Sequence, residues 1–160
     1  EIKPLDQFSV SISGCPNGCS RPQIADLGLL QASFPHVNEE SCTGCGICES
    51  ICKEKAIDTD SGVARISPEL CLSCGACLRN CPEEALLSFV RGYRVQVGGK
   101  LGRHPRLADE LPGIYSSDDV LEVLINCLQL HQKVYRPGLR FGQVISEYGW
   151  ARITDGLVQR

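Results

Sequence analysis

Eight of the eleven cysteines fall into two runs with the same spacing, and this spacing carries the clearest chemistry in the chain. The runs are Cys42-x-x-Cys45-x-x-Cys48-x-x-x-Cys52 and Cys71-x-x-Cys74-x-x-Cys77-x-x-x-Cys81. Corresponding cysteines lie 29 residues apart (71 minus 42). Three closely spaced thiolates can bind one side of a 4Fe-4S cube, while the fourth ligand comes from elsewhere in the fold. The two runs therefore predict two 4Fe-4S clusters.

The repeated pattern resembles that of bacterial ferredoxins with two clusters, in which the fourth cysteine of each run binds the other cluster. This resemblance gives cluster 1 the ligands Cys42, Cys45, Cys48 and Cys81, and cluster 2 the ligands Cys71, Cys74, Cys77 and Cys52. Pro82 follows the second run as the motif expects, whereas Lys53 follows the first. The alternatives are a disulfide framework, typical of small secreted chains, and structural zinc, which favours C-x-x-C pairs separated by a longer loop. The absence of a signal-peptide pattern and the close spacing within each run argue against both.

Composition bounds the remaining possibilities. A hydrophobic fraction of 42% in 160 residues supports a packed core, and a formal net charge of −3 gives no indication of nucleic-acid binding. No apolar run approaches the roughly 20 residues of a membrane span. Cysteine-rich chains without a secretion signal favour a reducing compartment, so a cytoplasmic location is expected. The chain begins at Glu1 and contains no Met, which favours excision or processing from a longer polypeptide.

A third group of cysteines, Cys15 and Cys19, must be positioned by the N-terminal segment. Phe8, Val10 and Ile12 alternate with serines, the period of a half-buried strand. This strand leads into a tight turn at 16–18, which presents the two cysteines on a compact loop. Pro22 can open a short helix after it.

Residues 13–22, Ser-Gly-Cys-Pro-Asn-Gly-Cys-Ser-Arg-Pro, are similar to the second cysteine motif of the sulfite and nitrite reductase family. In that family C-x5-C and C-x3-C pairs hold a 4Fe-4S cluster, and the last cysteine also bridges to the iron of sirohaem. The resemblance thus makes Cys15 a cluster ligand and Cys19 the bridging thiolate. No C-x5-C pair precedes Cys15, so this chain cannot complete that cluster. The alternative is a pair that binds nothing or forms a disulfide.

Residues 36–88, which contain both cysteine runs, are predicted to form a ferredoxin insert. Its four short strands are expected to pair 36–38 with 56–58, and 64–66 with 85–87. Short helices are expected after Cys48 and Cys77. Residues 58–62 are predicted to form a polar turn that links the two halves of the insert, each of which contains one cysteine run. Glycines beside the cysteines would let backbone N–H groups approach the clusters.

After the insert, a strand is expected over 90–97, followed by Gly98-Gly99 and a basic loop that contains Lys100, Arg103, His104 and Arg106. Such a loop is commonly a solvated turn. The family resemblance gives a more specific interpretation, in which Lys100, Arg103 and Arg106 contact sirohaem carboxylates, since Arg binds carboxylates with a bidentate fork.

Two helices are expected to close the chain, over 117–135 and 141–148. Ser116 and Asp119 form a capping box for the first of them. Its apolar face includes Cys127, interpreted as a small buried hydrophobe, with His131 at the edge of that face.

The expected class is α+β, with residues 1–35 and 89–160 forming part of a sirohaem α/β domain around the insert at 36–88. The resemblance covers nearly the whole chain and implies the C-terminal part of a dissimilatory or anaerobic sulfite (or nitrite) reductase. In that reading the ferredoxin clusters deliver single electrons for a six-electron reduction, with a redox protein or the rest of the reductase as partner. The alternatives are an electron-transfer module without activity of its own, or a subunit whose C-x3-C pair another polypeptide completes. No residue is nominated as a catalytic acid, and sulfite is not distinguished from nitrite.

Overall fold

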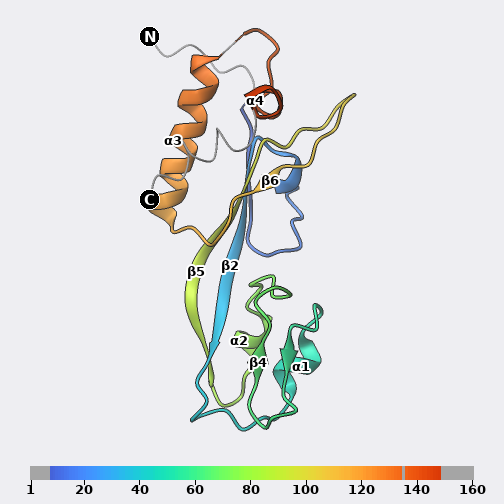
Figure 1. The fold of residues 1–160 in the computed structure, drawn as a ribbon, viewed down its shortest axis with the longest axis vertical. Helices are drawn as coiled ribbons and strands as arrows, with labels where there is room; N and C mark the ends of the chain where they lie inside the picture. Colours follow the sequence, from blue (N-terminus) through green and yellow to red (C-terminus); the bar gives the residue numbers. More distant parts are fainter. Residues whose placement is uncertain (1–7, 135, 149–160) are drawn as a thin grey trace. The chain divides into compact units, whose positions relative to one another are not determined.

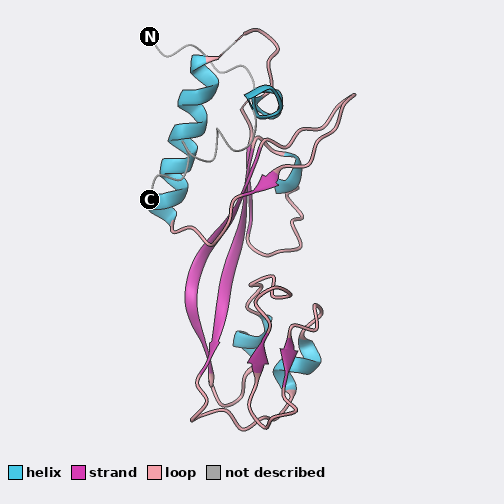
Figure 2. Cartoon of the chain, in the orientation of Figure 1, coloured by secondary structure: helices cyan, strands magenta, loops and turns pink. Residues whose placement is uncertain are grey.

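The computed structural model describes residues 8–134 and 136–148, and it contains both helices and strands, as predicted (Figures 1 and 2). The chain divides into two compact units, one of residues 31–92 and one of residues 1–30 with 93–160. The elements in chain order are β1 Val10–Ser13, the 3₁₀ helix η1 Pro22–Ile24, β2 Leu27–Val37, α1 Ile47–Ile51, β3 Ile57–Asp58, β4 Arg65–Ile66, α2 Ala76–Asn80, β5 Leu86–Val97, β6 Asp109–Glu110, α3 Ser117–Lys133 and α4 Phe141–Tyr148. None of the helices in the described part of the chain combines the length and apolar character that a membrane span requires.

A four-stranded sheet has the order β1-β2-β5-β6. β1 runs parallel to β2, with Val10 opposite Leu27, and β6 runs antiparallel to β5, with Glu110 opposite Gln96. β2 and β5 are long strands that continue through the division between the compact units at 30/31 and 92/93. The predicted boundaries at 35/36 and 88/89 therefore lie inside continuous strands, and the predicted three-part division stays a prediction.

The unit of residues 1–30 with 93–160 has an apolar core between the sheet and the helices α3 and α4. Leu27, Val95 and Val97 of the sheet are fully buried in the same cluster as Val123 and Cys127 of α3. Both helices occur where they were predicted, although α3 ends at Lys133 rather than 135. The Ser116 side chain accepts from the Asp119 N–H and the Asp119 carboxylate accepts from the Ser116 N–H, which confirms the capping box. Pro22 opens η1 as expected.

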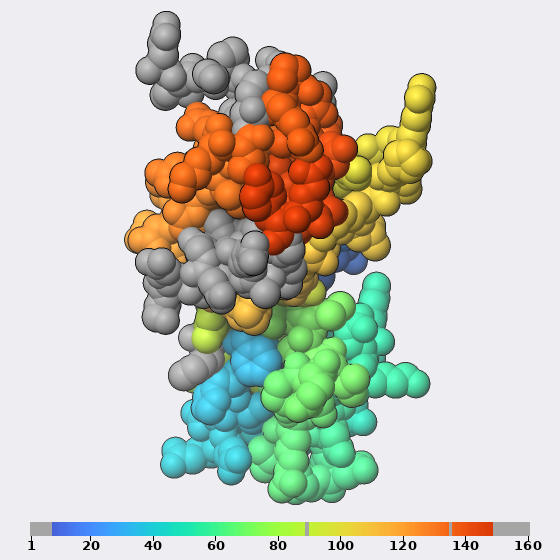
Figure 3. All heavy atoms as spheres, turned by 45° about the horizontal axis from the view of Figure 1, so that its top comes forward, coloured from blue at the N-terminus to red at the C-terminus, as the bar shows by residue number. Residues whose placement is uncertain are grey.

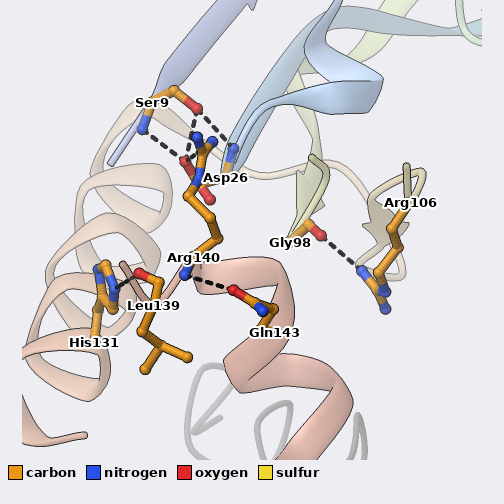
Figure 4. Close-up of polar contacts among 8 residues, drawn as sticks. All are labelled: Ser9, Asp26, Gly98, Arg106, His131, Leu139, Arg140 and Gln143. Atoms are coloured by element: carbon orange, nitrogen blue, oxygen red, sulfur yellow. Dashed lines mark hydrogen bonds and ion pairs between the residues drawn. The ribbon is translucent and has the colours of Figure 1, made fainter. Parts of the chain in front are cut away.

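The prediction for the face of β1 was wrong. Val10 and Ile12 are 46% and 61% exposed, whereas Ser13 is only 5% exposed. Alternation indicates that the two faces of a strand differ, but it does not identify the face that meets the core. Here a polar contact holds the start of the strand, because the buried Asp26 carboxylate accepts from the Ser9 N–H at 2.9 Å and from its hydroxyl at 2.7 Å (Figure 4).

His131 was expected at the edge of the α3 face, but it is 1% exposed. Its ring lies 6.0 Å from the ring of Phe8 and 5.8 Å from that of Phe141, centroid to centroid. Its Nε2 is within hydrogen-bonding distance, 3.2 Å, of the Leu139 carbonyl (Figure 4). The imidazole is therefore a packed core group that ties α3 to the connection before α4, because a buried polar ring needs a partner.

The unit of residues 31–92 pairs its short strands differently from the prediction. β3 pairs antiparallel with β4, which places Ile57 opposite Ile66. The segment at 36–38 instead meets the segment at 85–87: β2 and β5 are neighbours in the sheet, and the Asn38 N–H donates to the Ala85 carbonyl at 2.8 Å. The reason is the short polar turn, in which the Gly62 N–H donates to the Thr59 carbonyl at 3.0 Å and closes β3 onto β4 as a local hairpin. The helices also begin one residue before Cys48 and Cys77 rather than after them.

Candidate iron–sulfur centres

The 29-residue repeat of the sequence recurs in the backbone. Gly46 and Gly75, which directly precede α1 and α2, have φ values of 74° and 65°. The same spacing relates two further pairs of left-handed residues, Gly44 with Ser73 (64° and 54°) and Lys55 with Glu84 (51° and 49°). A non-glycine residue with positive φ is uncommon, so its repetition at matching positions shows that the two halves follow one backbone path. Each run therefore presents its cysteines in the same way.

The four cysteines predicted for cluster 1 line one hollow. Cys42, Cys45 and Cys48 of the first run meet Cys81 of the second there, together with Thr59 and other residues. Cys45 is exposed, Cys48 is buried, and Cys42 and Cys81 are half-buried. A hollow with four thiols from two separate runs suits a cluster that needs one thiolate per iron.

Among the four cysteines predicted for cluster 2, the charge of one thiolate affects the pKa of another. Burial raises the pKa of Cys71, and the negative charges of Cys74 and Cys52 raise it further. Burial likewise raises the pKa of Cys77 to about 11, with smaller contributions from Cys71 and Cys74. Cys52 packs against the buried cluster that contains Cys77, as the exchange of fourth ligands requires. Because an iron–sulfur cluster binds thiolates, a cluster held by these cysteines would displace the protons of their thiols.

Backbone N–H groups point at three of the sulfur atoms. The Ala64 N–H donates to the Cys42 sulfur at 3.4 Å, the Ala56 N–H to the Cys52 sulfur at 3.3 Å, and the Ser73 N–H to the Cys71 sulfur at 3.4 Å. Such bonds favour the thiolate form and influence the potential of a bound cluster. The sequence indicated close backbone approach only at the glycines, and nothing in the spacing identified Ala56, Ala64 or Ser73.

Cys15 and Cys19 lie in the predicted loop after β1, and both are exposed. The loop is closed by the Gly18 N–H, which donates to the Cys15 carbonyl at 3.3 Å, and by the Ser13 hydroxyl, which donates to the same carbonyl at 3.1 Å. Within residues 8–134 and 136–148, no three His, Cys, Asp or Glu side chains are grouped around a single metal-ion position. The roles of Cys15 as ligand and Cys19 as bridge stay predictions.

The basic loop between β5 and β6 is closed by its own residues. Lys100 and Arg106 exchange backbone hydrogen bonds of 2.9 and 3.0 Å, and the Arg106 guanidinium pairs with Asp109. The guanidinium also donates to the Gly98 carbonyl at 2.8 Å (Figure 4). Arg106 is thus engaged in holding the loop. The side chains of Lys100 and Arg103 form no hydrogen bond or ion pair with another described residue. In the space-filling view the loop (yellow) stands out from its unit (Figure 3).

Comparison with known families decides the kind of protein. The model of the nitrite and sulphite reductase 4Fe-4S domain matches residues 6–160. The chain belongs to this family. It is accordingly an iron–sulfur module of the sulfite reductase type, and the family resemblance and α+β class predicted from the sequence are confirmed.

Individual relatives agree with the family. A coenzyme F420-dependent sulfite reductase of Methanocaldococcus jannaschii is 54% identical over 97 residues, which cover 61% of this chain and 16% of that protein. One subunit of the anaerobic sulfite reductase of Salmonella typhimurium is 28% identical over 156 residues, covering 92% of this chain and 46% of the relative. The crystal structure of dissimilatory sulfite reductase I superposes with a TM-score of 0.68 at 18% identity, covering 96% of this chain and 42% of that one, and shows the shared fold. The chain thus spans less than half of each of these relatives.

Proposed function

We propose that this chain binds two 4Fe-4S clusters within a ferredoxin-like domain of residues 36–88 and supplies single electrons within a sulfite or nitrite reductase. The observation that carries the proposal is the hollow lined by Cys42, Cys45 and Cys48 together with Cys81 from the other run. The electrical influence of Cys52 on Cys71 supports the corresponding exchange at cluster 2. The membership in a 4Fe-4S reductase family gives the reaction class.

The chemistry follows from what the residues offer. A 4Fe-4S cluster held by four thiolates accepts and releases one electron at a time. The cysteines bind the irons, the N–H groups of Ala56, Ala64 and Ser73 stabilise the negative charge on sulfur, and burial of Cys48 and Cys77 shields one side of each site. The reduction of sulfite to sulfide consumes six electrons, so carriers that deliver electrons singly suit it. A reducing, cytoplasmic setting would preserve such clusters.

The sirohaem part of the proposal rests on the N-terminal loop. Cys15 would ligate a third cluster and Cys19 would bridge it to sirohaem, if another part of the reductase supplied the C-x5-C pair. The side chains of Lys100 and Arg103, which bond to no other residue that the structure describes, would be the contacts to sirohaem carboxylates, whereas Arg106 would fix the loop that presents them. The partner in this reading is the remainder of the reductase, with a redox protein as electron donor.

A second candidate is an electron-transfer module without catalytic activity of its own. The specific observation in its favour is that all eight run cysteines lie in one compact unit, residues 31–92. The clusters of residues 36–88 would function equally in this role.

The experiment that tests the proposal is the iron and acid-labile sulfide content, with the absorption spectrum, of anaerobically purified protein. About eight irons and a broad thiolate-to-iron shoulder are expected for two clusters. Additional iron with sharp porphyrinoid bands would support the sirohaem reading over the module. About four irons or fewer, or stoichiometric zinc, in fully folded protein would overturn the proposal of two clusters.

A further inference from the structure

The two cluster sites share a backbone path but differ in the charges around them. Comparing positions 29 residues apart isolates these differences from the common fold. Cys48 and Cys77 are 8% and 7% exposed, and Cys45 and Cys74 are both exposed. Because the exposure of these paired ligands is matched, the charges and hydrogen bonds around them are the features to compare.

Cluster 1 is flanked by carboxylates. Thr59, which lines its hollow, donates its hydroxyl to the Glu49 carboxylate on α1, and the residue that corresponds to Glu49 in the second half is the uncharged Leu78. The segment that follows the cluster 1 ligand Cys81 is Pro-Glu-Glu, and its Glu83 also lines the hollow. Negative charge beside a cluster disfavours the addition of an electron.

Cluster 2 is flanked by cations. The Arg79 guanidinium on α2 donates to the Cys74 carbonyl at 3.3 Å, and its counterpart in the first half is the uncharged Ser50. The segment that follows the cluster 2 ligand Cys52 is Lys-Glu-Lys, in place of Pro-Glu-Glu. Positive charge beside a cluster favours the reduced form, which carries one more negative charge.

Hydrogen bonds add to the same difference. The Ser73 N–H donates to the Cys71 sulfur of cluster 2 at 3.4 Å, and the Ser73 side chain acts to lower the pKa of Cys71, whereas its counterpart Gly44 has no side chain. Packing fixes this difference, because a Cβ on Gly44 would lie 2.3 Å from the Gly62 carbonyl oxygen. Ala56 donates a second N–H to cluster 2, at Cys52. At cluster 1, the Ala64 N–H donates to the Cys42 sulfur, and no bond from Ala85 to Cys81, the counterpart of the Ala56–Cys52 bond, occurs among the described residues.

We infer that cluster 2 has the higher reduction potential and holds the first electron that enters the protein, while Glu49 keeps cluster 1 more reducing. This inference rests on the proposed function, in that both clusters must be bound. Reduction takes each cluster from a charge of about −2 to about −3 by one electron. Flanking cations and sulfur-directed donors stabilise that added charge at cluster 2, and flanking carboxylates oppose it at cluster 1. Arg79, Ser73 and Glu49 are therefore tuning residues, which act on the potentials of the clusters.

The test is a redox titration of the anaerobic holoprotein with dithionite, monitored by electron paramagnetic resonance. Two reduction steps are expected. Glu49→Gln should raise the potential of the lower step, and Arg79→Gln and Ser73→Ala should lower that of the higher step. In the protein that has accepted one electron, an equilibrium constant describes how strongly this electron prefers cluster 2 to cluster 1. Each substitution should reduce this constant by about two- to fivefold, the size expected for exposed charges. Raised salt should diminish the two charge effects.

Matched variants separate tuning from damage. Arg79→Lys keeps the cation and should leave both steps near their wild-type potentials. Glu122→Gln removes a carboxylate charge, as Glu49→Gln does, but from the exposed face of α3 in the other unit, and it should not change the equilibrium constant. About eight irons in every variant would show that both clusters are bound, independently of their order. If Glu49→Gln moved the higher step, or Arg79→Gln the lower one, the inferred order would be overturned while the two-cluster proposal stood. Loss of iron already in the wild type would overturn the proposed function itself.

Discussion

At the scale of single residues, the exchange of fourth ligands is the most specific feature of the cluster assignment. Cys81 lies in the hollow of cluster 1 although it belongs to the second run, and the charge of Cys52 influences Cys71 although it belongs to the first. Replacement of Cys81 or Cys52 should therefore affect the cluster of the other run, not the cluster of the run to which that cysteine belongs.

Serine substitutions test this exchange. Cys81→Ser should reproduce the spectrum of Cys45→Ser, because both change a ligand of cluster 1, and Cys52→Ser should reproduce that of Cys74→Ser. Each variant should lose or convert one cluster, with about half of the iron affected. Electron paramagnetic resonance and iron analysis of the four variants provide the comparison. A Cys52→Ser spectrum that matches Cys45→Ser would contradict the exchange.

Cys127 gives a prediction for alkaline pH. It is 0% exposed in the α3 core, and burial raises the pKa of its thiol to about 12 from an ordinary value of 9.0. The unfolded thiol ionises first as pH rises, so its contribution to stability is complete below pH 9 and is lost as pH approaches 12. The free energy of unfolding should therefore fall by about 1.4 kcal/mol per pH unit above 9 more steeply than in Cys127→Ala. Denaturant titrations of both proteins at pH 8 and 10 measure this, and parallel slopes would refute it.

At the scale of helices and strands, the sequence was most informative where a local signal fixed an end. Ser116 and Asp119 marked the start of α3, and Pro22 the start of η1, because caps and proline act within a few residues. The pairing of 36–38 and the face of β1 were predicted wrongly, since these depend on contacts between distant residues. Asn38 meets Ala85, and Ser9 meets Asp26, and no local pattern encodes either contact.

α4 offers a test at this scale, because a close backbone approach there opposes helix propensity. A Cβ on Gly142 would lie 2.5 Å from the Gly98 carbonyl oxygen at the end of β5. Glycine to alanine within a helix usually stabilises by about 1 kcal/mol. Here Gly142→Ala should instead destabilise by about 1–3 kcal/mol, since backbone must move.

The control is Ser146→Ala, one turn later at an exposed position of α4. Its hydroxyl donates to the Gly142 carbonyl at 2.9 Å, and because such a bond back to the helix adds little stability, the free energy of unfolding should change by less than about 0.5 kcal/mol. Both variants can be compared by urea denaturation monitored by circular dichroism. Stabilisation by Gly142→Ala would show that α4 does not approach β5 as closely as described.

At the scale of the whole chain, the two compact units are held together internally by different means. The core of the unit of residues 1–30 with 93–160 joins sheet and helices and contains none of the eight run cysteines. The core of residues 31–92 is built largely around them, with Cys48 and Cys77 buried among Ile57, Ala64 and Leu86 and three further run cysteines packed beside them. The cysteine spacing predicts the cluster ligands, whereas the inferred tuning role of Glu49 and Arg79 depends on contacts that the fold creates, of Thr59 with Glu49 and of Arg79 with the Cys74 carbonyl.

This difference predicts how the units respond to loss of the clusters. A unit of about 60 residues buries only about 60% of the surface of its unfolded chain and is marginally stable, so cluster binding to cysteines in its core should add to its folding free energy. Removal of iron by anaerobic chelation should therefore increase amide exchange throughout α1, α2 and the β3–β4 hairpin, while α3 and α4 keep their protection because Leu27, Val95 and Phe141 still pack between sheet and helices. Hydrogen–deuterium exchange with peptide resolution measures both units in one experiment, and Cys127→Ala holoprotein, which retains its clusters, serves as the control. Equal loss of protection in α3 and in α1 would show that the clusters stabilise the whole chain, whereas unchanged exchange in α1 would show that residues 31–92 fold without them.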